Sequence, residues 1–378
     1  MLVTVSVSWA FLQAGRFAFS PLLPRIVADL EITTATAGLA LTLLQIVYAV
    51  VQYPSGQWSD ALGRATIIVP ALVVLILGFS LIGLATTVGL FVAGVVVIGV
   101  GKGLIASPER ALLFDLFETK RGRALGIFAA GTDVGGLLAS GLAIVALSVA
   151  GWRATFLPVV LALLATTVLF LAVNREPYRF ERPTTEFAAP IRRLFTTREQ
   201  VSVVLAFSLF YVMVSGFLNF FPTYLAATKG FSEASASGMF AVVFVVGMVI
   251  KPVVGTISDR FSRPLVAIGG FLVAAGALVG ILFVQATWLL VLAVVFLAIG
   301  YKTQFPIADA IVMEAAPDES MGGDLGAARA VFLGIGSLGP VLIGTLASRF
   351  DFTVAFGVLV VSLLTSAALL TYRYGVLD

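Results

Sequence analysis

Four charged residues lie near the middle of long apolar segments: Arg16, Lys102, Asp133 and Lys302. A charge at the centre of a membrane-spanning helix costs at least ~2.5 to 3.5 kcal/mol on insertion scales, so such a residue marks a functional site by default. Three of the four are cations. The planar fork of Arg16 suits bidentate binding of a carboxylate or a phosphate, and it stays charged when it is desolvated.

The sequence contains no histidine and no cysteine. Thiolate nucleophiles, disulfides, serine–histidine relays, imidazole proton shuttles and the usual zinc sites are therefore excluded by composition. The sequence also has no phosphate-binding loop motif. We expect a protein that is not an enzyme and that has no catalytic residue, no metal site and no cofactor.

The high hydrophobic fraction of the sequence is typical of a protein that lies in a membrane. Of the 378 residues, 60% are hydrophobic and only 11% are charged, whereas soluble domains have roughly 45 to 50% apolar and about 25% charged residues. Too few polar residues remain to cover a water-facing surface. We therefore expect an integral membrane protein in contact with the lipid bilayer, and no nucleic-acid partner despite the net charge of +3.

Twelve apolar segments have the roughly 20 residues that a helix needs to cross ~30 Å of hydrocarbon. They lie at about 5–28, 35–58, 65–86, 88–113, 122–148, 153–173, 200–226, 234–256, 263–284, 287–313, 325–347 and 351–373. The segments lack the alternation of barrel strands, so the expected fold class is all-α. The first segment has no basic region or cleavage site of a signal peptide, and we expect a retained helix.

The distribution of lysine and arginine predicts the orientation. If the N-terminus is cytoplasmic, most of the 23 basic residues fall in inner loops, and the outer loops hold Arg25, Arg153, Lys229 and Arg349. By the positive-inside rule, both termini then lie in the cytoplasm, and the chain is a multi-pass protein of the cell membrane.

The longest connection lies between the sixth and seventh segments and carries three prolines and mixed charges. We interpret it as a cytoplasmic linker over 174–199. It separates an N-terminal six-helix bundle over 1–173 from a C-terminal six-helix bundle over 200–378.

The two halves repeat each other. Four residues at the end of the second segment and just after it recur at the end of the eighth, at an offset of 199: Gly56, Ser59, Asp60 and Arg64 match Gly255, Ser258, Asp259 and Arg263. Acidic residues keep the same interval, because 55 residues separate Asp60 from Asp115 and also Asp259 from Glu314. Such internal self-similarity predicts two pseudo-symmetric bundles.

The stretch GQWSDALGR, from Gly56 to Arg64, resembles the loop signature of the major facilitator superfamily between helices two and three, and GTISDRFSR is a weaker copy. The stretches DLFETKRGRALG and Gly151-Trp152-Arg153 are also similar to family segments after helices four and five. The resemblance covers nearly the whole chain. It implies a monomer with a central cavity lined by helices one, four, seven and ten, and rocking of one bundle against the other.

On that resemblance, Arg16, Lys102 and Lys302 lie on helices that line the cavity, and this surplus of positive charge attracts an anion. Arg16 would anchor the anion; the alternative is a structural ion pair with Asp133. The two lysines would set the cavity potential, or else form ion pairs or extend toward the cytoplasmic surface. Lys102 and Lys302 are 200 residues apart, whereas the neighbouring acids Asp115 and Glu314 are 199 apart. One residue is about 100° of helix rotation, so the two lysines need not face the same way in their bundles.

Asp133 is the only acid near the middle of a predicted span. A carboxyl in low dielectric tends to bind a proton unless a cation compensates it, so Asp133 is the candidate for coupling transport to a proton or another cation. The alternative is a permanent counter-ion of Arg16 or Lys102. Glu109 and Asp309 lie nearer the cytoplasmic ends, and we assign them to the water-exposed gate.

Aromatic and amide side chains complete the predicted pocket: Tyr48, Tyr211, Asn219 and Gln304. Tyr211 and Asn219 share a face of helix seven, because eight residues are close to two turns. The alternative for each aromatic residue is packing or a place in the membrane interface. Glycines such as Gly135 and Gly339 predict close approach of helices.

Two sets of charged residues at the cytoplasmic ends form a candidate gate: Asp60, Arg64 and Asp115 in the first half, and Asp259, Arg263 and Glu314 in the second. Ion pairs within each set would lock two helices together when this side is closed, and breaking them changes the balance of two states by a few kcal/mol. The alternative is a role in topology and helix capping.

The sequence thus predicts a secondary active transporter of a small organic or inorganic anion, with a proton or cation as the candidate coupling ion. The main alternative is a multidrug or lipophilic-compound exporter of the same fold, because the interior is rich in phenylalanine. Two remote alternatives are a transport-dead sensor and an aspartyl enzyme that uses Asp133 and Asp309.

Overall fold

The computed structural model describes residues 1–117, 119–175, 198–258, 262–315 and 321–374, with all of their side chains except those of 198–199, 251–258, 313–315 and 321–326. Every regular element in this part of the chain is a helix. Twelve described segments are long and apolar enough to span a membrane. The predicted all-α fold class and the twelve spans are confirmed.

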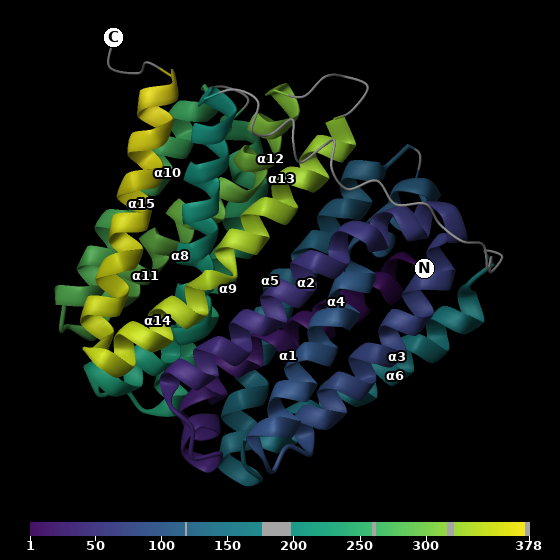
Figure 1. Cartoon of the computed structure of the whole chain (residues 1–378), viewed down its shortest axis with the longest axis horizontal. Helices are drawn as coiled ribbons and strands as arrows, with labels where there is room; N and C mark the ends of the chain where they lie inside the picture. The colour runs from purple at the N-terminus through teal and green to yellow at the C-terminus, as the bar shows by residue number, and fades with distance from the viewer. Residues whose placement is uncertain (118, 176–197, 259–261, 316–320, 375–378) are drawn as a thin grey trace. The chain divides into compact units, whose positions relative to one another are not determined.

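The chain divides into two compact units, Met1–Thr185 and Glu186–Asp378. The predicted linker over 174–199 falls mostly outside the described residues. Each unit is a bundle of helices (Figure 1).

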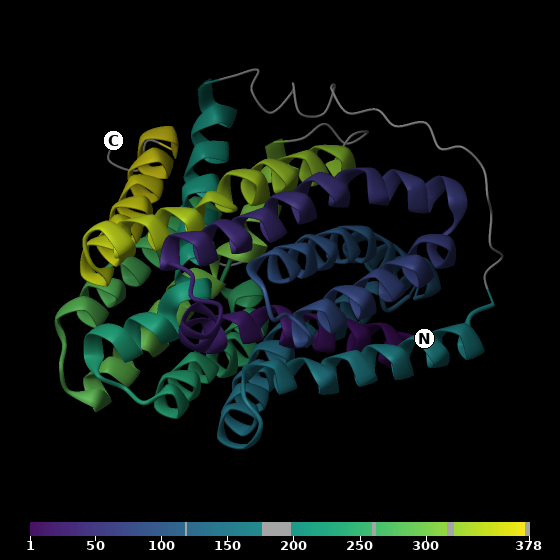
Figure 2. The same cartoon turned by 60° about the horizontal axis from the view of Figure 1, so that its bottom comes forward.

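The first unit consists of α1 (Leu2–Asp29), α2 (Thr34–Leu62), α3 (Arg64–Gly83), α4 (Val88–Leu116), α5 (Arg121–Val149), a 3₁₀ turn (Trp152–Thr155) and α6 (Phe156–Val173). Helix α1 packs mainly on α5 and α6, whereas α4 packs mainly on α2 and α3. Helices α3 and α6 join the two groups (Figure 2).

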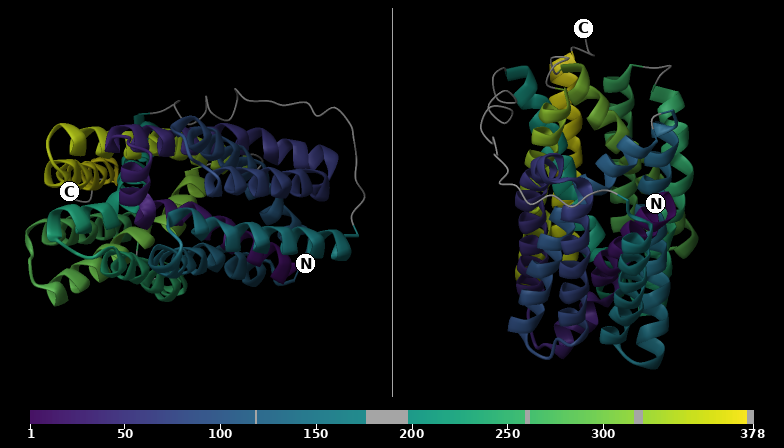
Figure 3. Two further views of the ribbon diagram at one scale, coloured as in Figure 1. Left: turned by 90° about the horizontal axis from the view of Figure 1, so that it is seen from below. Right: turned by 90° about the vertical axis from the view of Figure 1, so that its right-hand side faces the viewer.

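The second unit consists of α8 (Arg198–Lys229), α9 (Glu233–Ser258), α10 (Arg263–Phe283), α11 (Thr287–Lys302), α12 (Gln304–Ala315), α13 (Met321–Gly336), α14 (Leu338–Arg349) and α15 (Phe352–Tyr374). Helix α8 packs on α13, α14 and α15, α9 on α11, and α10 on α11 and α15 (Figure 3). Since α11 with α12 forms one span and α13 with α14 another, these pairs repeat those of the first unit.

Prolines explain why two spans of the second unit are divided. Pro306 and Pro340 lie in the first turns of α12 and α14. Each lacks the N–H that would bond to the carbonyl four residues earlier, which belongs to Lys302 and to Gly336, the last residues of α11 and α13. The ring of each proline also crowds that carbonyl, so the helix ends there.

Helix α4 contains Pro108 and still runs without a break. The carbonyl that Pro108 leaves without its usual donor is that of Leu104, and the Ser55 hydroxyl of α2 donates to it at 2.6 Å. A hydroxyl from a neighbouring helix is one of the few groups that can satisfy such a carbonyl in hydrocarbon. Ser55 therefore ties α2 to α4 at this point.

Glycines allow the helices to approach closely, as the sequence predicts. A Cβ added to Gly135 of α5 would lie 2.5 Å from the carbonyl oxygen of Ala10 on α1. In the second unit, a Cβ on Gly339 of α14 would collide with the carbonyl oxygen of Val212 on α8. The same helix pair thus depends on glycine in both units.

We expect Gly135→Ala to destabilise the protein by about 1 to 3 kcal/mol, because the added methyl group forces α1 and α5 apart. Gly141 is the matched control: it lies on the same helix with open space around its Cβ position, and Gly→Ala in a helix is otherwise neutral or stabilising. Thermal unfolding of the two purified variants measures the difference. Equal melting temperatures would contradict the close packing of α1 on α5.

Candidate functional site

Lys102 lies in the middle of α4 and is 5% exposed. Glycines on either side of it let two helices approach α4 closely: a Cβ on Gly103 would meet Val51 of α2, and one on Gly101 would meet Leu75 of α3. The Nζ atom lies 4.2 Å from the ring centroid of Tyr48 on α2. A desolvated ammonium over a tyrosine face is stabilised by about 2 kcal/mol.

Two guanidinium groups lie close enough to Lys102 for their charges to act on it: those of Arg16 on α1 and Arg110 on α4. Arg16 is 9% exposed, and its guanidinium carbon lies 4.6 Å from the ring centroid of Phe17. The first unit therefore brings three cations close to Tyr48: Arg16 and Lys102 are buried, and Arg110 is half-buried. Arg110 is the member of this cluster that the sequence did not single out.

Two carboxyl groups are completely buried in the same unit. Asp133 lies on α5 next to Thr132, whose hydroxyl oxygen accepts a hydrogen bond of 2.9 Å from the Trp9 indole of α1. Glu109 lies on α4, with its Oε1 atom 2.5 Å from the Ser8 hydroxyl oxygen of α1. The assignment of Glu109 to a water-exposed gate is wrong, because this face of α4 turns toward α1 and away from water.

In the second unit, Lys302 is the last residue of α11 and is 3% exposed. Its Nζ atom lies 4.9 Å from the ring centroid of Phe244 on α9 and 5.2 Å from that of Tyr301. A cation at a helix C-terminus is favoured by the helix dipole. The partial negative charge at the end of α11 thus stabilises the Lys302 ammonium group, whereas Lys102 lies in the middle of α4 and has no helix terminus beside it.

The other predicted pocket residues of the second unit have local partners. The Gln304 amide nitrogen donates to the carbonyl oxygens of Ala267 on α10 (3.0 Å) and Gly300 on α11 (3.2 Å). The Asn219 amide nitrogen donates to Ser215 of its own helix at 2.7 Å. Tyr211 stacks on Phe332 and meets Phe305 edge to face, each with ring centroids 5.7 Å apart.

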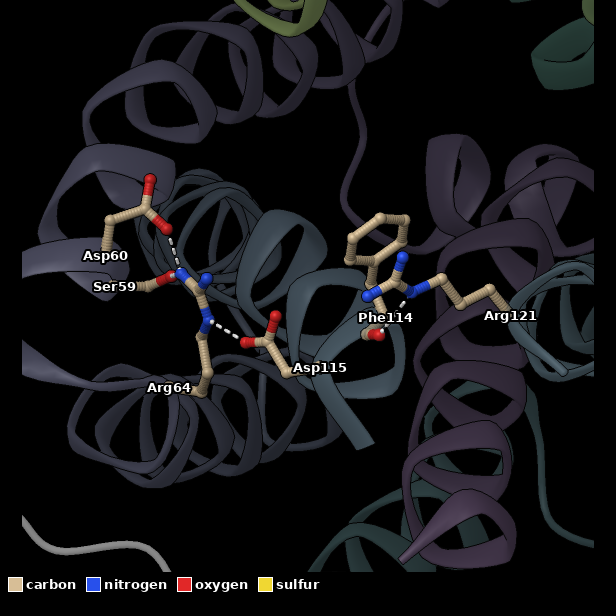
Figure 4. Close-up of polar contacts among 6 residues, drawn as sticks. All are labelled: Ser59, Asp60, Arg64, Phe114, Asp115 and Arg121. Carbon is tan, nitrogen blue, oxygen red and sulfur yellow. Dashed lines mark hydrogen bonds and ion pairs between the residues drawn. The ribbon is translucent and has the colours of Figure 1, made fainter. Parts of the chain in front are cut away.

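The predicted gate residues of the first half lie together (Figure 4). Arg64, the first residue of α3, donates to Asp60 at the end of α2, to the Ser59 hydroxyl at 2.8 Å and to Asp115 of α4 at 3.0 Å. One guanidinium fork therefore connects the ends of three helices. The neighbouring Arg121 of α5 donates to the carbonyl oxygen of Phe114 at 3.1 Å, also on α4.

The second gate set is described only in part. Arg263 is the first residue of α10, where the Ser262 hydroxyl accepts from the Leu265 amide as an N-cap. Asp259 lies outside the described residues, and so does the side chain of Glu314.

The second unit contains a half-exposed ion pair that the sequence did not predict. Arg329 of α13 binds both carboxylate oxygens of Asp309 on α12, one of them at 2.9 Å. A signal for this position exists in the sequence: Lys302 and Asp309 are seven residues apart, as are Lys102 and Glu109. Both units thus place a lysine and an acid two turns apart on the equivalent span.

Comparison with known proteins gives three findings. The family model described as Major Facilitator Superfamily matches residues 5–278 and 232–376. A "Probable sulfoacetate transporter" from Cupriavidus necator is 25% identical over 64% of this chain and 60% of its own length, and a "Hexuronate transporter" from Bacillus subtilis is 26% identical over 65% and 60%. The chain therefore matches less than two thirds of the length of these relatives.

A solved structure has the same fold. It is the crystal structure of a bacterial homolog to the human lysosomal transporter Spinster, in an inward-facing and occupied conformation. Its TM-score is 0.85 at 17% identity, over 98% of this chain and 96% of that one.

The Arg64 contacts predict energetic coupling between α3 and α4. In a double-mutant cycle of Arg64→Gln and Asp115→Asn, we expect a coupling free energy of about 0.2 to 1 kcal/mol, the range of pairs that are partly exposed to solvent. Thermal unfolding of the two single variants and the double variant measures it, and added salt is expected to reduce it. Strictly additive losses would contradict the contact.

Proposed function

The chain belongs to the Major Facilitator Superfamily, and from that premise we propose that it carries a small organic or inorganic anion across the cell membrane by secondary active transport. The protein is a multi-pass membrane transporter. We also propose the orientation that the basic residues predict, with both termini in the cytoplasm.

The observation that carries the proposal is the environment of Lys102. Its ammonium group is buried in an apolar helix bundle, and the charges of Arg16 and Arg110 add to its own. Clustered cations create a positive potential around them, and such a potential attracts an anionic ligand.

Arg16 and Lys102 have different roles in the proposed site. The guanidinium of Arg16 presents a rigid fork that fits the two oxygens of a carboxylate or phosphate, so it fixes the orientation of the anion. The ammonium of Lys102 is a compact charge that raises the local potential without demanding one geometry. Tyr48, which lies under that ammonium, keeps it in place.

In the second unit, we assign the equivalent role to Lys302, with Tyr211, Asn219 and Gln304 as polar neighbours of the substrate. Asp133 is a candidate for coupling or for the counter-ion of the cations. The Arg64 network and its partial repeat at Arg263 are the proposed cytoplasmic gate. The family relationship supports alternating access, in which such contacts form in one state and break in the other.

The names of two relatives agree with an anionic substrate. Sulfoacetate and hexuronate each carry a sulfonate or carboxylate group that an arginine fork can bind. These names support the class of substrate, and the buried cations give a physical reason for it.

The test is thermal stabilisation of the purified protein by nitrate, phosphate, sulfoacetate, glucuronate, glucose and a lipophilic cation. A ligand at 100 times its dissociation constant adds about 2.7 kcal/mol to the stability. We expect one or more of the anions to stabilise the wild type and to lose this effect in Lys102→Met and Arg16→Ala. Without ligand, Lys102→Met should be no less stable than the wild type, because it removes a buried charge.

Arg123→Gln is the matched control, since Arg123 is a cation exposed on the first turn of α5. It should keep the full stabilisation by anions. Equal stabilisation of Lys102→Met and the wild type would contradict the proposed site. Stabilisation by the lipophilic cation alone would favour an exporter instead.

A further inference from the structure

The proposed anion site does not use Glu109, although this carboxyl group is completely buried. It projects from α4 one residue after Pro108 and meets Ser8 of α1. Helix α1 packs mainly on α5 and α6, and α4 mainly on α2 and α3. The contact between Ser8 and Glu109 therefore links two helices, α1 and α4, that otherwise touch each other little.

The single proton of the Ser8 hydroxyl decides which group is the donor in its contact with Glu109. The Ser8 hydroxyl oxygen lies 2.9 Å from the carbonyl oxygen of Val5 and 2.5 Å from Oε1 of Glu109. A hydroxyl has one proton, and a carbonyl oxygen can only accept. Both contacts are hydrogen bonds at the same time only if Ser8 donates to Val5 and Glu109 donates to Ser8, which requires a protonated carboxyl group.

The second oxygen of Glu109 supports the same protonation state. Oε2 is buried and has no hydrogen-bond partner among the described residues. An ionised carboxylate has about four lone-pair sites to satisfy, and leaving them unpaired in an apolar interior is far more costly than burying a neutral acid. The neutral acid is the form that fits this position.

The charge of the adjacent Arg110 acts on Glu109 electrostatically. The Arg110 guanidinium lies over the rings of Trp9 and Phe128, at 5.4 and 5.8 Å from their centroids. The other charged residues on α4 and on the helices packed around it are Arg16, Arg25, Asp29, Asp60, Arg64, Lys102, Asp115, Arg121, Arg123 and Asp133. Of these, Arg64 donates to both Asp60 and Asp115.

We propose that Glu109, and not the sequence-based candidate Asp133, is the proton-binding site of the transport cycle. In the conformation described here, Glu109 holds the proton and donates it to Ser8. When α1 and α4 separate, the O–H bond breaks, the proton passes to water, and the remaining carboxylate pairs with the Arg110 guanidinium. The proposal rests on the proposed transport function, and it makes a proton the ion that travels with the anion.

Infrared spectroscopy tests the protonation of Glu109 without any substrate. We expect the purified wild type at neutral pH to show the C=O stretch of a carboxylic acid, and Glu109→Gln to lose it. Ser8→Ala should shift this band without removing it, because the acid keeps its proton but loses its acceptor. Asp115→Asn is the control and should leave the band unchanged, since Asp115 is paired with Arg64. No acid band in the wild type, or a band that survives in Glu109→Gln, would overturn the proposal.

Proteoliposomes with a pH-sensitive dye in the lumen test the coupling. Addition of nitrate, sulfoacetate or glucuronate outside wild-type vesicles should acidify the lumen, and Glu109→Gln should lose this acidification while Arg123→Gln keeps it. Acidification by Glu109→Gln at the wild-type rate would overturn the proposal. If anions fail to stabilise the protein, the infrared result still decides the state of Glu109, so the two proposals fail separately.

Discussion

A bilayer interior supplies no hydrogen bonds and almost no dielectric screening, so every polar group inside this protein has to find its partner within the chain. The backbone meets this requirement by forming helices. At Pro108, the Ser55 hydroxyl replaces the lost donor to the carbonyl of Leu104; at Pro306 and Pro340, the preceding helix ends, at Lys302 and Gly336. Charged side chains follow the same rule, and the few that are buried identify the places where a ligand or a proton can bind.

The two units share a pair of charged residues, but the acid of this pair has a different environment in each unit. Each has a lysine followed seven residues later by an acid on the equivalent span. In the second unit, Asp309 binds Arg329 in a half-exposed ion pair. In the first unit, Glu109 is buried against Ser8, and no arginine of the described residues binds its two oxygens. Asp309 is thus a structural partner of Arg329, whereas Glu109 can bind or release a proton.

The sequence predicted the features that depend on composition and periodicity. The twelve spans, the family and the glycines at close helix contacts follow from apolar length, a loop motif and small residues at interfaces. The position of Glu109 was not predictable in this way, because its depth along α4 and the rotation of that helix decide its exposure. For the same reason the sequence did not show that Gln304 would bond to backbone carbonyls of α10 and α11, or that Arg329 would meet Asp309.

The breaks at Thr303 and Ser337 give the second unit a mechanical property that the first does not share. A continuous helix such as α4 or α5 transmits a tilt at one end to the other end, since its hydrogen-bond ladder is unbroken. A span divided between α11 and α12, or between α13 and α14, lets its two parts tilt independently at little elastic cost. The two units therefore differ in bending stiffness although their topology is similar. Lys302 lies directly next to one of the breaks that make the second unit easier to bend.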